Sequence, residues 1–195
     1  VRRQRQMCIR DRTYSDGEIM MPDEFKNAYK ESVDAGWLST SCKPEHGGMG
    51  VPIFFQTVIW AEFGTSANMA LSVLPALSVG VYEVLAEHGE KELVDYFATN
   101  MASGKWSGTM CLTEPHAGTD LGMISTKAVP QKDGTYLVTG TKIFITYGEH
   151  DMTENIVHLV LAKTPDAPEG TRGISLFLVP KYMPSEWKSE GLAGL

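Results

Sequence analysis

Two short segments combine strand-like apolar residues with hydroxyl side chains, and they are the best candidates for chemistry. Residues 111–120 read Cys-Leu-Thr-Glu-Pro-His-Ala-Gly-Thr-Asp, an apolar strand end that breaks into a loop of small residues. Residues 142–146 read Lys-Ile-Phe-Ile-Thr and are expected to form a strand that ends on a hydroxyl beside an aromatic ring. Such donors suit the polar edge of a flat heterocycle lying on a β-sheet. From the pattern alone, however, threonines at strand ends are more often ordinary strand formers, and a phenylalanine more often belongs to the core.

Motifs of several other enzyme classes are absent from the sequence. There is no Gly-x-Gly-x-x-Gly after a strand, no Gly-x-Ser-x-Gly and no His-Glu-x-x-His, which argues against a Rossmann unit, a serine-hydrolase elbow and a zinc peptidase. Glu149, His150 and Asp151 could be imagined as metal ligands, but adjacent residues on a loop seldom converge on one ion. We therefore expect no metal site, and a solvated turn whose acidic groups cap the next segment.

The composition is that of an ordinary globular protein, with 195 residues of which 43% are hydrophobic and 21% charged. The cysteines Cys8, Cys42 and Cys111 are scattered and odd in number, which favours reduced thiols and a cytoplasmic location. No apolar run approaches the ~20 residues of a membrane span, so no membrane partner is expected.

Charge is distributed unevenly along the chain. Residues 1–12 contain five arginines and one aspartate, a net charge of +4, whereas the remainder contains 12 basic and 23 acidic residues, a net charge of −11. An acidic body disfavours nucleic acid as a partner. Residues 1–12 are expected to be a non-native or disordered tail, with a natural basic tail or an organellar presequence as alternatives. Residues 189–195 contain no closing strand or helix. Together with the unusual residues 1–12, this leads us to expect that the sequence is truncated at both ends.

Periodicity divides the chain into a helical half and a β half. Helices are expected after Pro22, after Pro52 and over 90–101. A further helical segment is expected to run through Met69 and Leu74, to break or restart at Pro75, and to close at His88-Gly89. In the first of these, Phe25, Tyr29 and Val33 recur every four residues. The expected strands are 106–112, 126–129, 136–139, 142–146, 156–162 and 174–179, and the second and third flank a Lys-Asp-Gly turn signal.

This pattern predicts an α+β fold with two domains. A helical N-terminal domain would cover residues 13–104, and a partial antiparallel, barrel-like β domain would cover residues 105–195. A C-terminal helical domain is expected to be missing.

Three motifs in order resemble the acyl-CoA dehydrogenase family. Residues 111–120 resemble its flavin-binding signature, followed by Thr126-Lys127-Ala128; residues 142–146 are similar to its Lys-x-Trp-Ile-Thr segment; and residues 44–50 are similar to its Pro-Glu-x-x-Gly-Gly-x-Gly loop with one residue fewer. The resemblance covers essentially residues 20–182. Within the family, residues 147–158 resemble the branch that contains 3-methylmercaptopropionyl-CoA dehydrogenase, which degrades dimethylsulfoniopropionate among other acyl-CoA substrates.

The resemblance implies an FAD-dependent reaction on an acyl-CoA. A glutamate takes the α-proton, the β-hydrogen passes as hydride to flavin N5, a trans-2-enoyl-CoA forms, and electron-transfer flavoprotein reoxidises the cofactor. By position, Leu112 and Thr113 would meet the pyrimidine edge of the flavin, Thr146 its N5 side and Phe144 one face. Thr119 would lie near the pantetheine arm of CoA and the flavin phosphates, and so would bind both cofactor and substrate. The remaining cofactor residues by this resemblance are Met110, Gly118 and Ile145.

Some residues depart from the family pattern. Phe144 replaces the commoner tryptophan, His116 replaces a common glycine, and Met123 stands where a small residue is preferred. Glu114 is not expected to be the base, because in the family this glutamate supports the loop and the base lies in a later helical domain. No catalytic residue is therefore expected in this chain, which alone should be inactive; the complete protein is expected to form a homo-oligomer.

Two alternatives remain open from the sequence. The first is an acyl-CoA oxidase or nitroalkane oxidase relative, which oxygen reactivity would distinguish. The second is a DNA-associated flavoprotein of the same superfamily, against which the acidic body argues.

Overall fold

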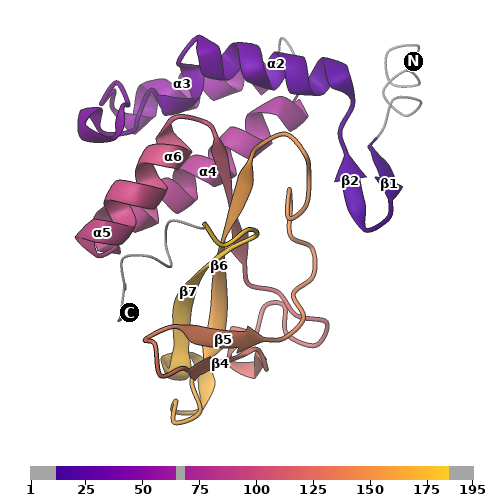
Figure 1. Ribbon diagram of the computed structural model, residues 1–195, viewed down its shortest axis with the longest axis vertical. Helices are drawn as coiled ribbons and strands as arrows, with labels where there is room; N and C mark the ends of the chain where they lie inside the picture. The colour runs from indigo at the N-terminus through magenta and orange to yellow at the C-terminus, as the bar shows by residue number, and fades with distance from the viewer. Residues whose placement is uncertain (1–11, 65–68, 185–195) are drawn as a thin grey trace. The chain divides into compact units, whose positions relative to one another are not determined.

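The structure is a computed structural model that describes residues 12–64 and 69–184 (Figure 1). Its chain divides into two compact units. One comprises Val1–Gly108 with Tyr147–Ile156, and the other comprises Thr109–Thr146 with Val157–Leu195. Of the predicted tail at residues 1–12, the structure describes only Arg12. The prediction for residues 1–11 therefore lies outside the described residues.

The first unit begins with a small hairpin followed by helices (Figure 1). Strands β1 and β2 pair antiparallel around Asp16 and Gly17, both of which have positive φ. The regular elements of this unit up to the sheet are β1 Thr13–Ser15, β2 Glu18–Met20, α2 Asp23–Asp34, η1 Trp37–Ser39, η2 Pro44–His46, α3 Ile53–Phe63, α4 Met69–His88, α5 Lys91–Leu93, η4 Val94–Ala98 and α6 Thr99–Ala102.

Helix α2 forms where the four-residue periodicity predicts it. Pro22 supplies the N-cap, and Gly36, at φ 77°, lies just beyond the helix end. The side chain of Tyr29 is buried with Leu74, and Phe25 and Val33 pack against this pair. The Tyr29 hydroxyl donates to the Gly104 carbonyl oxygen at 3.0 Å, so its polar end is satisfied inside the core.

Pro75 neither breaks nor restarts its helix, contrary to the sequence-based expectation. It lies inside α4, which runs without interruption over Met69–His88. Burial explains the difference, because Pro75 and Leu74 are both buried and tertiary packing can offset the hydrogen bond that proline cannot donate.

The helical stretch from Lys91 to Ala102 carries one apolar face, as predicted. Leu93, Phe97 and Met101 are buried at intervals of four residues. Its middle, Val94–Ala98, is a π-helical segment. Over the described ranges, no helix combines the length and the hydropathy needed to cross a membrane.

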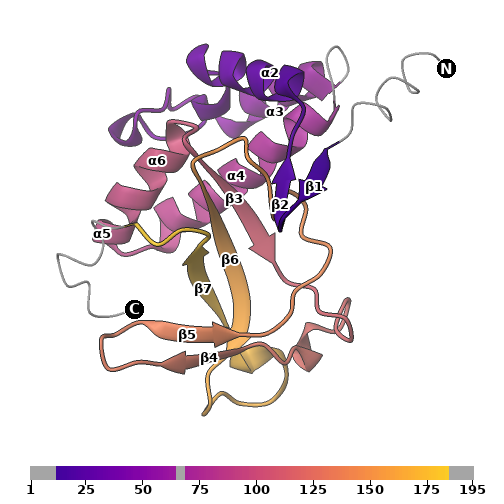
Figure 2. The same cartoon turned by 45° about the vertical axis from the view of Figure 1, so that its right-hand side comes forward.

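The sheet contains five strands in the order β3-β6-β4-β5, with β7 paired to β6 (Figure 2). They are β3 Trp106–Cys111, β4 Lys127–Pro130, β5 Tyr136–Thr139, β6 Asn155–Lys163 and β7 Ile174–Pro180. Short 3₁₀ turns, η5 Leu121–Met123 and η6 Gly170–Gly173, lie in the connections. Each of these five strands begins and ends within one residue of its predicted range.

The predicted fold class is confirmed, but the sheet is mixed rather than wholly antiparallel. Strands β4 and β5 pair antiparallel, as do β6 and β7, whereas β4 and β6 run parallel where Lys127 faces Lys163. Parallel neighbours need a long connection instead of a tight hairpin. Here β5 and residues 140–154 supply it, and these residues also carry half of the candidate site.

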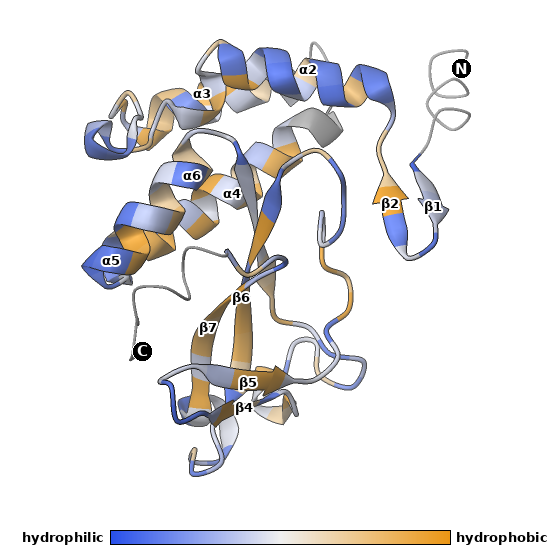
Figure 3. Cartoon of the chain, in the orientation of Figure 1, coloured by the Kyte–Doolittle hydropathy of each residue, from blue (hydrophilic) through white to orange (hydrophobic). Residues whose placement is uncertain are grey.

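Strand β6 is buried along most of its length. Ile156, Val157, Leu159 and Ala162 are at most 2% exposed. Figure 3 shows β6 and β7 mostly in the hydrophobic colour. A strand with neighbours on both sides and both faces covered has this near-continuous apolar sequence, so β6 is the strand on which the sheet is built.

Candidate functional site

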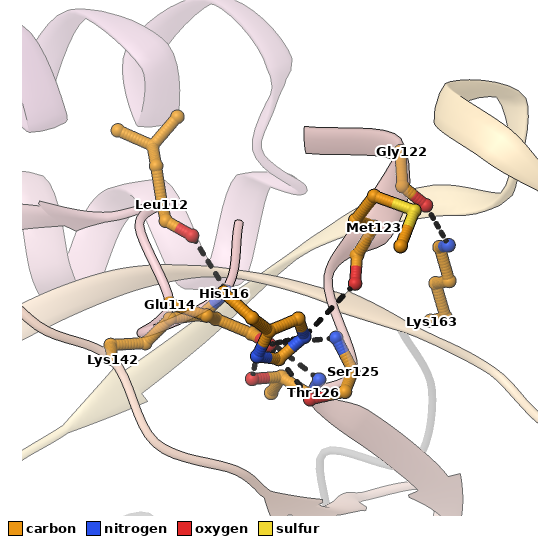
Figure 4. A network of polar contacts seen from close by, with 9 residues as sticks. All are labelled: Leu112, Glu114, His116, Gly122, Met123, Ser125, Thr126, Lys142 and Lys163. Atoms are coloured by element: carbon orange, nitrogen blue, oxygen red, sulfur yellow. Dashed lines mark hydrogen bonds and ion pairs between the residues drawn. The ribbon is translucent and has the colours of Figure 1, made fainter. Parts of the chain in front are cut away.

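The candidate site begins where β3 ends and the chain turns back on itself. The Glu114 N–H donates to the Ala117 carbonyl oxygen at 2.9 Å, and the Ala117 N–H donates to the Glu114 carbonyl oxygen at 3.1 Å. This tight turn points the Glu114 side chain into the protein, where it is 1% exposed. Figure 4 shows the polar network that surrounds it.

Five donors bind the Glu114 carboxylate. Oε2 accepts from the Ser125 N–H at 2.7 Å and from the Ser125 hydroxyl at 2.8 Å. Oε1 accepts from the Thr126 N–H at 3.0 Å, the Thr126 hydroxyl and the Lys142 ammonium. Burial by itself would raise the pKa of Glu114, but these hydrogen bonds outweigh it and hold the pKa well below its usual range. Glu114 is therefore an ionised structural anchor and not a proton acceptor.

Lys142 connects the two segments that the sequence singles out. Its side chain is 10% exposed. Its ammonium group donates to the Leu112 carbonyl oxygen at 2.9 Å and to Glu114 Oε1 at 3.0 Å. One residue on, the Ile143 N–H donates to the Thr113 carbonyl oxygen at 2.9 Å. Residues 111–120 and 142–146 are thus brought side by side, as their joint role in one site requires.

The loop after the Glu114 turn is held in place at several points. The Asp120 carboxylate accepts from the Gly122 N–H at 3.0 Å, and the Lys163 ammonium donates to the Gly122 carbonyl oxygen at 2.7 Å. His116 Nε2 lies 3.1 Å from the Met123 carbonyl oxygen, which makes it the donor of that hydrogen bond. These contacts shape the loop that carries Gly118 and Thr119, and Figure 4 shows those of Lys163 and His116.

Glycine is required at position 140 for a reason that the sequence does not reveal. A Cβ atom there would lie 2.2 Å from the Thr126 hydroxyl oxygen and 2.9 Å from the Thr126 Cα. Any side chain would therefore push against the residue that binds Glu114, so the close approach of residue 140 to Thr126 belongs to the framework of the site.

Residues 142–146 are not a strand, which corrects the prediction for this segment. Phe144 has φ 58° and Tyr147 has φ 54°, values that bulky residues rarely adopt and that a strand excludes. Nor is Phe144 a core residue, because it is 88% exposed. A strained backbone that holds an aromatic ring in the open favours a functional role for this segment.

The predicted site residues are distributed between partly buried and exposed positions of this region. Met110, Leu112, Thr113 and Ile145 are partly buried, whereas Gly118, Thr119, Phe144 and Thr146 are exposed. Within the described part of the chain, the hydroxyls of Thr113, Thr119 and Thr146 form no hydrogen bond. They remain available to a ligand.

The turn at residues 149–151 is not simply solvated, so that expectation is wrong for two of its residues. His150 is 2% exposed, with Nε2 3.1 Å from the Ser107 hydroxyl and Nδ1 accepting from the Met152 N–H. Asp151 accepts from the Met21 N–H at 2.8 Å and pairs with Lys26. Across the described ranges, no group of three or more His, Cys, Asp or Glu side chains is placed to hold a metal ion.

Sequence reasoning missed the anchoring roles of Ser125, Thr126 and Lys142. In the sequence, Lys142 stands out only as the first residue of a motif. The one sequence signal for Lys142 is that a charged residue immediately precedes the largely apolar Ile-Phe-Ile-Thr run.

Two protein-family models match most of the chain. The acyl-CoA dehydrogenase N-terminal domain matches residues 9–105, and the acyl-CoA dehydrogenase middle domain matches residues 109–193. Among curated proteins, a 3-methylmercaptopropionyl-CoA dehydrogenase of Ruegeria pomeroyi is 50% identical over 171 residues, which cover 88% of this chain and 29% of that protein. The chain therefore spans less than a third of the length of this relative.

Solved structures show the same likeness. One described as the electron transferring flavoprotein of Acidaminococcus fermentans is 29% identical with a TM-score of 0.71, and the match covers 82% of this chain and 40% of that one. An acyl-CoA dehydrogenase from Bacillus anthracis, in complex with FAD, is 26% identical with a TM-score of 0.66, over 80% of this chain and 26% of that one.

Proposed function

The chain belongs to the acyl-CoA dehydrogenase family, and from this we propose that residues 110–146 supply the flavin-contacting surface of an FAD-dependent acyl-CoA dehydrogenase. The observation that carries the proposal is the joining of two segments by Lys142 and Ile143. Both segments carry hydroxyls that have no partner among the described residues. Family membership implies that the cofactor is FAD. The residues of the two segments would provide hydrogen-bond donors to it.

The residues present fit a flavin. The pyrimidine edge of the ring system accepts hydrogen bonds, and Thr113 offers a hydroxyl with no partner among the described residues. In the proposed arrangement Leu112 and Thr113 bind that edge, Thr146 binds the N5 side, and the exposed ring of Phe144 covers one face. Thr119 reaches the cofactor phosphates and the pantetheine arm of the substrate. Met110, Gly118 and Ile145 complete the surface.

When bound, FAD supplies the oxidising centre that accepts the β-hydrogen of the acyl-CoA. The chain's own residues hold donors at the ring edge, where preorganised hydrogen bonds stabilise developing negative charge. Phe144 excludes water from one face. Glu114 is unsuited to removing the α-proton, because its ionised carboxylate is already engaged by five donors. The proton-abstracting glutamate is accordingly proposed to lie outside this sequence.

The proposed substrate is 3-methylmercaptopropionyl-CoA, and the proposed electron acceptor is an electron-transfer flavoprotein. The identity of 50% to the Ruegeria pomeroyi protein supports the substrate. The likeness to the Acidaminococcus fermentans structure supports the acceptor. A homo-oligomer is the proposed state of the complete protein.

Anaerobic turnover with purified complete protein tests this function. We expect 3-methylmercaptopropionyl-CoA to reduce an electron-acceptor dye, faster than butyryl-CoA at equal concentration, and the 195-residue chain alone to give negligible reduction. Rapid release of hydrogen peroxide in air would favour the acyl-CoA oxidase alternative. Absence of bound flavin in the complete protein would refute the proposal.

A further inference from the structure

Lys142 is a nearly buried cation bonded to the backbone of the segment that is proposed to meet the flavin edge. Its ammonium group donates to the Leu112 carbonyl oxygen at 2.9 Å while its side chain is only 10% exposed. Hydrogen bonds to charged groups are stronger than neutral ones, and little water is present to screen this one. The charge of Lys142 therefore acts on the Leu112 carbonyl more strongly than a surface lysine would.

The Leu112 carbonyl and the Thr113 N–H belong to the same peptide group. A cation bound to the oxygen of a peptide draws electron density toward it and makes the N–H of that peptide a stronger donor, which is how hydrogen bonds in series reinforce each other. The Thr113 N–H has no acceptor within the described part of the chain. The strengthened donor is therefore free for a ligand at the proposed site.

Glu114 fixes this cation and limits its effect. Its Oε1 lies 3.0 Å from the Lys142 ammonium. Ser125 and Thr126 bind the same carboxylate, so the carboxylate stays ionised and holds Lys142 in one position. The two charges have opposite effects on any negative charge that develops at the Thr113 N–H.

We propose that Lys142 is a positioning residue that raises the reduction potential of the flavin through the Leu112–Thr113 peptide. Reduction brings negative charge to the pyrimidine edge, and a polarised Thr113 N–H binds that charge more strongly than it binds the oxidised ring. This inference rests on the proposed function, because it requires the flavin edge to meet Thr113.

A purely structural role for Lys142 makes a different prediction. If Lys142 only holds residues 111–120 against residues 142–146, then removing either member of the Lys142–Glu114 pair should weaken flavin binding in the same way. If its charge tunes the flavin, K142M and E114Q should shift the potential in opposite directions, because the first leaves an unpaired anion and the second an unpaired cation.

The test uses the complete protein with its flavin, equilibrated anaerobically with a reference dye. At a fixed potential, we expect K142M to raise the ratio of oxidised to reduced flavin by about tenfold and E114Q to lower it. K142R should keep the ratio within about twofold, because it retains the charge. Shifts of the same sign in K142M and E114Q, or no shift in either, would overturn the proposal.

Lys163 provides a matched control. Its ammonium group also donates to a backbone carbonyl, that of Gly122, at 2.7 Å. The N–H of that peptide belongs to Met123 and is already bonded to the Asp120 carbonyl oxygen, so K163M should shift the ratio much less than K142M. An equal shift in K163M would contradict the role of the Thr113 N–H.

Two further outcomes are informative. If K142M loses its flavin, E114Q and K142R still test the inference. We then expect E114Q to lower the ratio of oxidised to reduced flavin and K142R to keep it. Failure of E114Q to lower this ratio would count against the inference. If the wild-type protein binds flavin and oxidises acyl-CoA while K142M leaves the ratio unchanged, the inference fails and the proposed function stands. A wild-type protein without flavin would instead refute the proposed function.

Discussion

The backbone N–H of Ile143 lies 2.9 Å from the carbonyl oxygen of Thr113 and donates a hydrogen bond to it. This bond joins two segments that lie about 30 residues apart in the sequence, and the Lys142 side chain reinforces it from the preceding position. The site is therefore assembled by backbone and buried charge, while the hydroxyls of Thr113 and Thr146 have no partner among the described residues.

Removal of the Glu114 carboxylate should destabilise the protein strongly. In E114A, Lys142 would be left as a nearly buried, unpaired cation, and the donors of Ser125 and Thr126 would lose their acceptor. The expected loss of unfolding free energy is about 3–5 kcal/mol, measured by denaturant unfolding. The exposed Glu169 serves as control, because E169A should stay within about 0.5 kcal/mol. A similarly small effect of E114A would show that the network is not an anchor.

The depressed pKa of Glu114 predicts a stability that falls in acid. Because the folded-state pKa lies below the unfolded value of about 4.3, the contribution is complete above that value and is lost as pH falls toward the folded pKa. Unfolding free energy measured between about pH 7 and pH 3 should therefore drop more steeply for wild type than for E114Q. Parallel curves for the two proteins would contradict the assignment.

An alanine at position 140 should disturb the anchor by steric crowding. Its Cβ would lie 2.2 Å from the Thr126 hydroxyl oxygen and close to backbone, and overpacking of this kind costs about 1–3 kcal/mol. Thermal unfolding of G140A measures the loss. A Cβ atom at Gly80 would have no neighbouring atom within 4 Å, so G80A in helix α4 should be neutral or stabilising by up to about 1 kcal/mol. Equal melting temperatures for G140A and wild type would disprove the crowding.

Substitution of Phe144 should weaken flavin binding without reducing the stability of the fold. Its side chain is 88% exposed and its φ of 58° suits asparagine better than phenylalanine. F144N is expected to leave the stability of the flavin-free protein unchanged or slightly raised, and to weaken FAD binding about fivefold, since stacked aromatic contact is worth about 1 kcal/mol. L137N, at an exposed apolar position of β5, should leave FAD affinity unchanged. A stability loss in F144N with normal FAD binding would assign Phe144 to the fold instead.

Local patterns were enough to predict most of the elements. Strand β5 has its predicted bounds because alternation and a turn signal specify it locally, and the α2 face around Tyr29 follows from its four-residue spacing. The parallel pairing of β4 with β6 was missed because it depends on contacts between distant residues, which local periodicity does not contain.

The errors at the site have a common physical cause. Residues 142–146 have the composition of a strand, but the side-chain bonds of Lys142 and the positive φ of Phe144 override that preference. His150 has the polarity of a surface residue, yet its hydrogen bonds to Ser107 and Met152 allow it to be buried. The domain limits at residues 104 and 105, and the flavin-contacting roles of the site residues, remain predictions.

The most direct test of the account is the FAD affinity of the complete protein after T113V and T146V are combined. Both changes keep side-chain volume while removing hydroxyls that have no protein partner among the described residues, so folding should be unaffected. T139V, at an exposed position on β5, is the matched control. We predict that FAD dissociates at least about tenfold more readily from the double variant, with a loss of acyl-CoA oxidation, while T139V behaves as wild type. Unchanged FAD retention and turnover in the double variant would contradict the claim that these two segments bind the flavin.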